Sequence, residues 1–216
     1  MKFESIFLGQ SIIRYQVPLE VFVGLNELYE TQKKHLPNAN KQLAGKIQDE
    51  VSLFYGGPTN KKMHTHSYVS EDILKWFYSI FDHYLKWNKT QEYRMDINSI
   101  WVNEMKAGDY NPVHIHQGRL FTGLSSVMFL KLPKDMGPEI ARPDQPMNGQ
   151  LQFLGSASGQ FVTSDYSPEM KIGDFYVFPY DVRHVVYPFT NKKEKRRTLV
   201  CNVDVSYNPV ASRTAQ

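Results

Sequence analysis

The chain has 216 residues, of which 41% are hydrophobic and 22% are charged, which is the composition of one ordinary globular domain. Its formal net charge of +3 gives no general electrostatic reason to bind nucleic acid. The single cysteine, Cys201, excludes an internal disulfide framework and fits a reducing compartment.

The first twenty residues lack the composition of a targeting segment. Their apolar part carries Glu4, Gln10 and Arg14, which interrupt the continuous apolar core that a signal peptide needs. No apolar run in the chain approaches the ~20 residues that span a membrane. We therefore expect a soluble cytoplasmic protein without a membrane partner.

The N-terminal part of the sequence predicts a strand followed by helices. Residues 6–17 are strand-like, and Pro18 suits the N1 position of the helix that follows. Residues 40–54 predict a second, weaker helix, which the sequence YGGPTN ends. Ser70 is a typical N-cap, and the helix predicted from there to about Trp87 carries an apolar stripe that faces a core.

From Tyr93 onward the pattern changes to short runs rich in β-branched and aromatic residues. Gly, Pro, Asn and Asp separate these runs, as they do in a sandwich or barrel of many short strands. The sequence therefore predicts a mainly β (α+β) fold in a single domain, residues 1–216. An N-terminal strand and helical layer (1–94) would pack its helices on one face of a β core (95–207).

Two histidines two residues apart, His114 and His116, stand in the strand-like run HIHQG. In a strand, residues i and i+2 point the same way with Cα atoms about 6.5–7 Å apart, so both imidazoles can converge on one metal ion. His184 follows another strand-like run that ends in a Pro turn, and enough strands lie between to bring it back beside His114. The pattern predicts a metal site of His114, His116 and His184.

The order of GDYNPVHIH, LSSVMFLKLP, GDFYVFPYDVRHVVYPF and RRTLVCN resembles the iron(II)/2-oxoglutarate-dependent oxygenases. The resemblance covers residues 95–206 and is strongest to a branch of small members from bacteria and phages. It implies a double-stranded β-helix, or jelly roll, in which His-x-Asp/Glu and a distant His hold Fe(II). It also implies 2-oxoglutarate as co-substrate, dioxygen as oxidant, and the host cytoplasm as location if a phage encodes the chain.

In that family, a basic residue on the strand after the distant histidine holds the far carboxylate of 2-oxoglutarate. Arg196 and Thr198 supply the Arg-x-Ser/Thr pattern on one strand face, while Arg197 points the other way. Asn103, on the strand before the metal motif, is a further candidate to bond the co-substrate.

The activity implied by the resemblance is that of a hydroxylase, which couples 2-oxoglutarate decarboxylation to oxidation of a substrate C–H bond. No catalytic residue is expected beyond the metal ligands. The substrate would be a small molecule or a peptidyl side chain, and nucleic acid is not an expected partner. Two alternatives stay open: a cupin-like three-histidine dioxygenase that does not use 2-oxoglutarate, and a non-enzymatic jelly-roll binding or virion-associated protein.

His116 departs from the family pattern, because it stands where the family carries a carboxylate. Three interpretations compete. The site has three histidine ligands; or two histidines hold the metal with one position open, and His116 only supports a ligand or contacts the substrate; or a carboxylate from Asp109 or Glu104 is the missing ligand. We favour the first, because the i, i+2 spacing already directs both rings to one point.

Several other features have plainer interpretations. The second HxH pair, His64 and His66, is predicted to lie in a surface loop without a common ligand. The basic run 192–197 is predicted to be a solvated turn from which only Arg196 points inward. Cys201 is expected to face the core, and the Pro-rich segment 133–149 is a candidate lid over the substrate.

Overall fold

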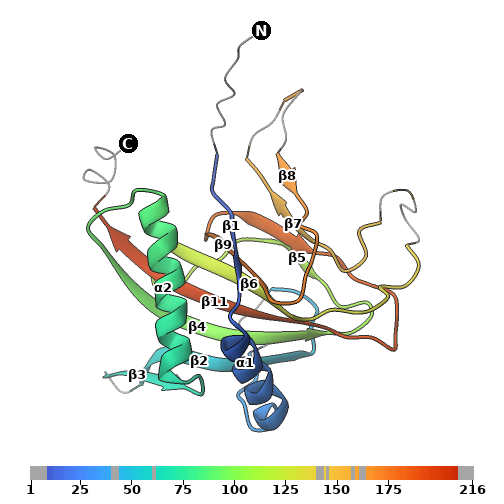
Figure 1. Ribbon diagram of the computed structural model, residues 1–216, viewed down its shortest axis with the longest axis horizontal. Coiled ribbons are helices and arrows are strands. Elements are labelled where there is room, and N and C mark those ends of the chain that lie inside the picture. Colours follow the sequence, from blue (N-terminus) through green and yellow to red (C-terminus); the bar gives the residue numbers. More distant parts are fainter. Residues whose placement is uncertain are drawn as a thin grey trace.

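The computed structural model describes residues 9–39, 44–59, 62–139, 144, 146–156, 159–160 and 164–208, with the backbone alone described for 55–59 and 62–65. Two antiparallel sheets lie face to face, and two helices cover the outer face of the larger sheet (Figure 1). The predicted mainly β fold with helices on one face is confirmed, and the two stacked sheets form the jelly-roll core.

The larger sheet has seven strands and the smaller has four. In spatial order the larger sheet contains β1 (Ile13–Gln16), β9 (Asp174–Pro179), β6 (Gly123–Lys131), β11 (Arg196–Tyr207), β4 (Tyr93–Met105), β2 (Asp49–Thr59) and β3 (Lys62–Ser67). The smaller sheet contains β5 (Asn111–His114), β10 (Arg183–Val186), β7 (Leu151–Leu154) and β8 (Asp165–Tyr166).

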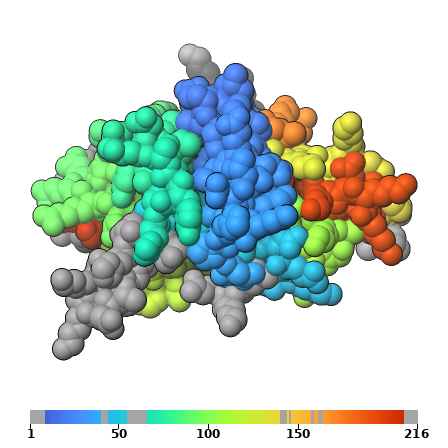
Figure 2. Space-filling model, turned by 90° about the horizontal axis from the view of Figure 1, so that it is seen from below, coloured from blue at the N-terminus to red at the C-terminus, as the bar shows by residue number. Residues whose placement is uncertain are grey.

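Helices α1 (Leu19–Gln32) and α2 (Glu71–Trp87) form the layer predicted from the apolar periodicity. The Ser70 hydroxyl accepts a hydrogen bond from the backbone N–H of Ile73, which confirms the predicted N-cap of α2. The helices lie next to one another (Figure 2), and the Ile73 side chain reaches Gly24 of α1, where a Cβ would stand 3.2 Å from it. Their buried faces share one hydrophobic cluster with the outer face of the larger sheet, and this cluster includes Cys201 as expected.

A second hydrophobic cluster fills part of the space between the two sheets. Because side chains alternate along a strand, β11 and β4 each contribute to both clusters. Leu199 and Cys201 of β11 face the helices, whereas Val200 faces the smaller sheet. This alternation decides which polar residues of the two strands can reach the space between the sheets.

The predicted helix over residues 40–54 is wrong. Its described part contains strand β2, which pairs with β4, so tertiary pairing overrides the weak helical preference of this stretch. The described part of the sequence YGGPTN, residues 55–59, does not end a helix but belongs to β2, which pairs with β3. His64 and His66 therefore lie on a strand rather than in a loop, and His66 is exposed as expected.

The first helix begins one residue later than predicted. Pro18 is the N-cap residue of α1 rather than its first helical residue. Among the described residues, no helix is both long and apolar enough to cross a membrane. The start of the first predicted strand (6–8) and part of the Pro-rich segment (140–143 and 145) lie outside the described residues.

Candidate metal and co-substrate site

A cavity of about 780 Å³ lies between the two sheets. Its floor is the inward face of β11 and β4, because alternate residues of each strand point into it. From β11 these residues are Arg196, Thr198, Val200 and Asn202. The structure therefore confirms that Arg196 and Thr198 share a strand face, and it brings them into the same cavity as the three histidines.

His114 and His184 face each other across neighbouring strands. The register of β5 and β10 makes them direct partners, so their side chains lie on the same face of the smaller sheet. Their ring centroids are 4.2 Å apart. Phe178 packs edge-on against the His184 ring at 4.9 Å, which limits its rotation.

His116 joins the pair from a loop rather than from a strand. Strand β5 ends at His114, so the expected i, i+2 strand geometry does not extend to His116. The backbone N–H of His116 instead donates to the Tyr180 carbonyl at 2.9 Å, and this bond fixes the loop beside the cavity. The ligand nitrogens of all three histidines lie within 4.8 Å of one another.

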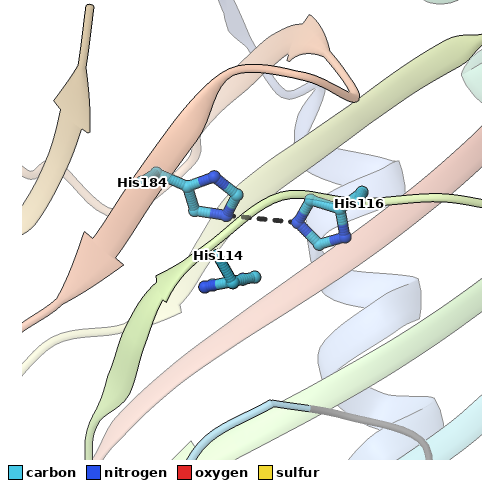
Figure 3. Close-up of side chains that lie close together, drawn as sticks. All are labelled: His114, His116 and His184. Carbon is cyan, nitrogen blue, oxygen red and sulfur yellow. Dashed lines mark hydrogen bonds between the residues drawn. The ribbon is translucent and has the colours of Figure 1, made fainter.

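The His184 and His116 rings face each other, and His114 lies beside them (Figure 3). The Nδ1 atoms of His114 and His184 lie 2.7 and 3.0 Å from the carbonyl oxygens of Pro112 and Val182. A carbonyl can only accept, so each Nδ1 carries the proton and each Nε2 presents a lone pair to the cavity. The hydrogen bond at Nδ1 of each ring thus directs Nε2, the metal-binding atom, into the cavity, as is usual for metal-ligating histidines.

The spacing of the nitrogens suits a metal ion. The Nε2 atoms of His116 and His184 are 3.1 Å apart. Two nitrogens at 2.1 Å from one ion and at right angles are separated by about 3.0 Å. The lone pair of His184 Nε2 can be this close to His116 Nε2 in two ways. His116 Nε2 carries a proton and donates it in a hydrogen bond, or both nitrogens bind one metal ion.

Burial keeps the three imidazoles neutral, which is the form that binds a metal. It lowers the pKa of His184 to about 3 and holds the pKa of His116 well below its usual value. Burial also lowers the pKa of His114, although the Pro112 carbonyl opposes this shift. The site therefore offers three neutral nitrogen donors at neutral pH.

Arg196 is a fully buried cation without a carboxylate partner in the described part of the chain. Its side chain is 1% exposed. Its guanidinium contacts the sulfur atoms of Met105 and Met170 and lies over the Phe129 ring, and Nε has no hydrogen-bond partner. Burial lowers its pKa to about 10, so it remains charged at neutral pH. An isolated buried cation is costly, and an anionic ligand would offset that cost.

Other polar atoms on the cavity wall also lack partners. Of the seven buried side-chain atoms without a hydrogen bond in the described residues, five belong to residues that line this cavity. They are Trp101 Nε1, Asn103 Oδ1, Asn111 Oδ1, Arg196 Nε and Asn202 Oδ1. Because buried polar groups are rarely left unpaired, this concentration indicates a site that binds polar ligands.

Asn202 lies beside His116. Its amide group is 3.4 Å from His116 Nδ1, and its Oδ1 has no other partner. Turning the amide would let this oxygen accept a hydrogen bond from Nδ1–H and would leave the His116 Nε2 lone pair facing the other two histidines.

Arg197 departs from the expectation that the basic run is solvated. It is buried on the helix side of β11, where it donates to Glu104 of β4 and to Glu30 of α1. Its guanidinium also lies 4.1 Å from the centre of the Tyr29 ring. The reason is that strand alternation, after placing Arg196 in the cavity, sends Arg197 into the layer between sheet and helices.

These contacts also argue against Glu104 or Asp109 as the missing metal ligand. Burial alone would raise the pKa of Glu104, but Lys195 and Arg197 hold it below its usual value, so Glu104 is an ion-pair partner outside the cavity. Asp109 accepts from the backbone N–H of Lys106. Within the described residues, no carboxylate belongs to the histidine cluster.

Glu50 and Ser52 line the cavity and were missed by the sequence analysis. Both lie on β2, in the stretch predicted to be a helix. The alternation of polar Glu50 and Ser52 with apolar Val51 and Leu53 is a strand signal that could have identified them. None of the described residues of the Pro-rich segment 133–149 lines the cavity, so the lid interpretation gains no support.

Comparisons with known proteins agree with this architecture. Residues 99–202 match the family described as "Putative 2OG-Fe(II) oxygenase". That range contains all six predicted site residues, whereas Glu50 and Ser52 lie outside it. No curated protein sequence matches the chain.

Solved structures share the fold at low sequence identity. A prolyl-4-hydroxylase from Pseudomonas putida is 14% identical, with a TM-score of 0.54 over 91% of this chain and 92% of that one. A Trichoplax adhaerens prolyl hydroxylase, solved with a hypoxia-inducible-factor peptide, is 12% identical, with a TM-score of 0.55 over 96% and 87%. The 2-oxoglutarate-dependent epimerase SnoN of nogalamycin biosynthesis is 11% identical, with a TM-score of 0.56 over 93% and 79%.

The matched family and the shared fold agree with the chemistry of the cavity. The family implies Fe(II) as the metal and 2-oxoglutarate as the co-substrate, and the cavity offers three neutral imidazoles and an unpaired cation to receive them. Over residues 99–202 the chain resembles the 2OG-Fe(II) oxygenase family, and as a whole it shares the fold of the prolyl hydroxylases.

Proposed function

We propose that this protein is a hydroxylase that uses Fe(II) and 2-oxoglutarate to oxidise a C–H bond of a small-molecule or peptidyl substrate. One observation carries the proposal: a fully buried, unpaired Arg196 shares a cavity with three converging imidazoles. A ligand with a carboxylate at one end and a metal-chelating group at the other would pair with Arg196 and bind the metal held by the imidazoles.

In this proposal each residue of the cavity has a defined task. His114, His116 and His184 hold the metal through Nε2, and their Nδ1 atoms fix the ring orientations. Arg196 and Thr198 bind the far carboxylate of 2-oxoglutarate, because a planar guanidinium and a neighbouring hydroxyl donate to it together. Asn103 lies opposite Thr198 in the strand register, so its amide can add a further hydrogen bond.

The bound Fe(II) and 2-oxoglutarate supply the oxidising chemistry when dioxygen is present. The protein orients the substrate and excludes water: Phe178 and Phe153 pack around His184 and close the inner side of the site.

An anaerobic titration tests the proposal. The Fe(II)-loaded protein should develop a visible charge-transfer band as 2-oxoglutarate is added. Metal binding without this band would contradict the proposal and favour a three-histidine dioxygenase that does not use 2-oxoglutarate. Failure to bind metal would instead favour a non-enzymatic binding protein.

The ligand role of His116 has its own test. His116→Ala should weaken Fe(II) binding by more than about 100-fold. Removing a residue that only orients a metal ligand already lowers metal affinity by about 10- to 100-fold. His116→Asp should restore binding by supplying the carboxylate that the family pattern carries. Metal analysis after dialysis measures both variants. His66→Ala, which changes an exposed histidine of the other HxH pair, is the matched control, and undiminished iron in His116→Ala would exclude a ligand role.

A further inference from the structure

Glu50 is a buried acid on the cavity wall to which neither the metal site nor the co-substrate site assigns a task. It is 3% exposed and is the one acidic residue among the described residues that line the cavity. No hydrogen bond or ion pair from the described part of the chain reaches its carboxyl group. Burial first, and the charge of Asp109 second, raise its pKa to about 7.

The strand register places Glu50 at a defined distance from the co-substrate residues. Glu50 of β2 lies opposite Asn103 of β4, and Asn103 lies opposite Thr198 of β11. The three side chains therefore form one row on the cavity face of the sheet. Neighbouring strands are about 4.8 Å apart, so the backbones at Glu50 and Thr198 are separated by about 10 Å.

The two unpaired ionisable groups of the cavity, the cation of Arg196 and the acid of Glu50, thus do not meet. Arg196 and Glu50 form no ion pair, since Asn103 and Thr198 stand between them in the sheet. A dianion bound at Arg196 and Thr198 would leave the space beside Glu50 for a second molecule. A cationic group is the chemical partner that a desolvated carboxylate accepts most favourably.

We propose that Glu50 selects a substrate that carries a cationic nitrogen, an ammonium or guanidinium group, and anchors it at the β2 side of the cavity. The inference rests on the proposed oxygenase function and adds the class of substrate. Glu50 touches the substrate but not the reacting C–H bond, so it sets affinity and orientation. Ser52, next along the same face of β2, lies beside this anchor.

Paired probes that differ only in charge test the inference. Isothermal titration calorimetry would use the Fe(II)–2-oxoglutarate protein under argon, which prevents turnover. The probes are arginine against citrulline and lysine against norleucine, each as the free amino acid and within an acetylated, amidated glycine-flanked tripeptide. At least one cationic probe should bind about 10- to 100-fold more tightly than its neutral partner, the range of a charge-assisted hydrogen bond.

Variants assign the preference to Glu50. Glu50→Gln keeps the shape of the side chain and should reduce the cationic-to-neutral affinity ratio to near one. Asp49→Asn is the matched control, because Asp49 lies on the same strand but pairs with Lys106 outside the cavity, and it should retain the ratio.

The outcomes separate this inference from the proposed function. A protein that shows the 2-oxoglutarate band but no cationic preference, or binds no cationic probe at millimolar concentration, overturns the inference alone. Persistence of the preference in Glu50→Gln also overturns it. A protein without the band overturns the proposed function and the inference with it. A preference confined to free amino acids identifies a small-molecule substrate, and one confined to tripeptides identifies a peptidyl substrate.

Discussion

Replacing Arg196 by methionine is expected to weaken 2-oxoglutarate binding strongly while the free energy of unfolding stays equal or rises. The affinity loss follows because the far carboxylate would lose its buried charged partner, which costs about 2–5 kcal/mol, or about 30-fold to several thousand-fold in affinity. The stability gain follows because the variant removes an unpaired buried charge and leaves an apolar side chain among Met105, Met170 and Phe129.

Two measurements on one sample check this expectation. The anaerobic titration gives the 2-oxoglutarate affinity, and urea denaturation of the metal-free protein gives the unfolding free energy. Arg196→Lys keeps the charge but loses the planar fork, so it should retain part of the affinity. Wild-type affinity in Arg196→Met would show that the co-substrate carboxylate binds elsewhere.

Replacing the next residue, Arg197, by methionine is expected to have the opposite effect. Arg197 joins β11, β4 and α1 through Glu104 and Glu30, and Glu104 is itself buried. Its loss would leave the Glu104 carboxylate with only Lys195 as a charged partner, so the protein should lose about 3–5 kcal/mol of stability. The folded fraction should bind 2-oxoglutarate normally, because Arg197 lies outside the cavity.

A double variant makes the reason testable. If the loss of stability arises from the buried Glu104 charge that no longer has its arginine partner, then Arg197→Met combined with Glu104→Leu should recover part of the lost stability in urea denaturation. An additive loss in the double variant would show instead that packing against Tyr29 and α1 carries the effect. The neighbouring arginines thus offer a matched pair in which one affects binding and the other affects stability.

The arginine pair also shows what the sequence could and could not predict. Alternation along a strand is local, so the opposite directions of Arg196 and Arg197 followed from the sequence RRTLVCN alone. The burial of Arg197 did not, because it depends on Glu104 and Glu30, which come from distant segments. A basic run beside a turn is typical of a solvated surface, and only the helix layer changes that outcome.

The histidines were predicted for a reason that proved only partly right. Their residue types and order indicated one cluster, and the structure brings them together. The strand geometry invoked for His116 was wrong, because β5 ends at His114 and the Tyr180 carbonyl positions the loop instead. Such a long-range backbone bond leaves no local pattern in the sequence.

Residues 40–54 were misassigned for an energetic reason. Gln, Lys, Glu and Ala in this stretch favour a helix weakly, whereas pairing of Glu50 and Val51 with β4 supplies hydrogen bonds and burial that propensity does not anticipate. The error concealed the inward direction of Glu50, because only a strand sends alternate residues into the cavity.

The position of β11 has a consequence for how the chain folds. The last strand in the sequence lies in the middle of the larger sheet, between β6 and β4. A growing chain therefore cannot complete this sheet until residues 196–207 have left the ribosome, and before then the edges of β6 and β4 are unpaired. Folding should be slow, since it requires contacts between distant parts of the chain. Truncation before Arg196 would leave two open half-sheets that are prone to aggregate.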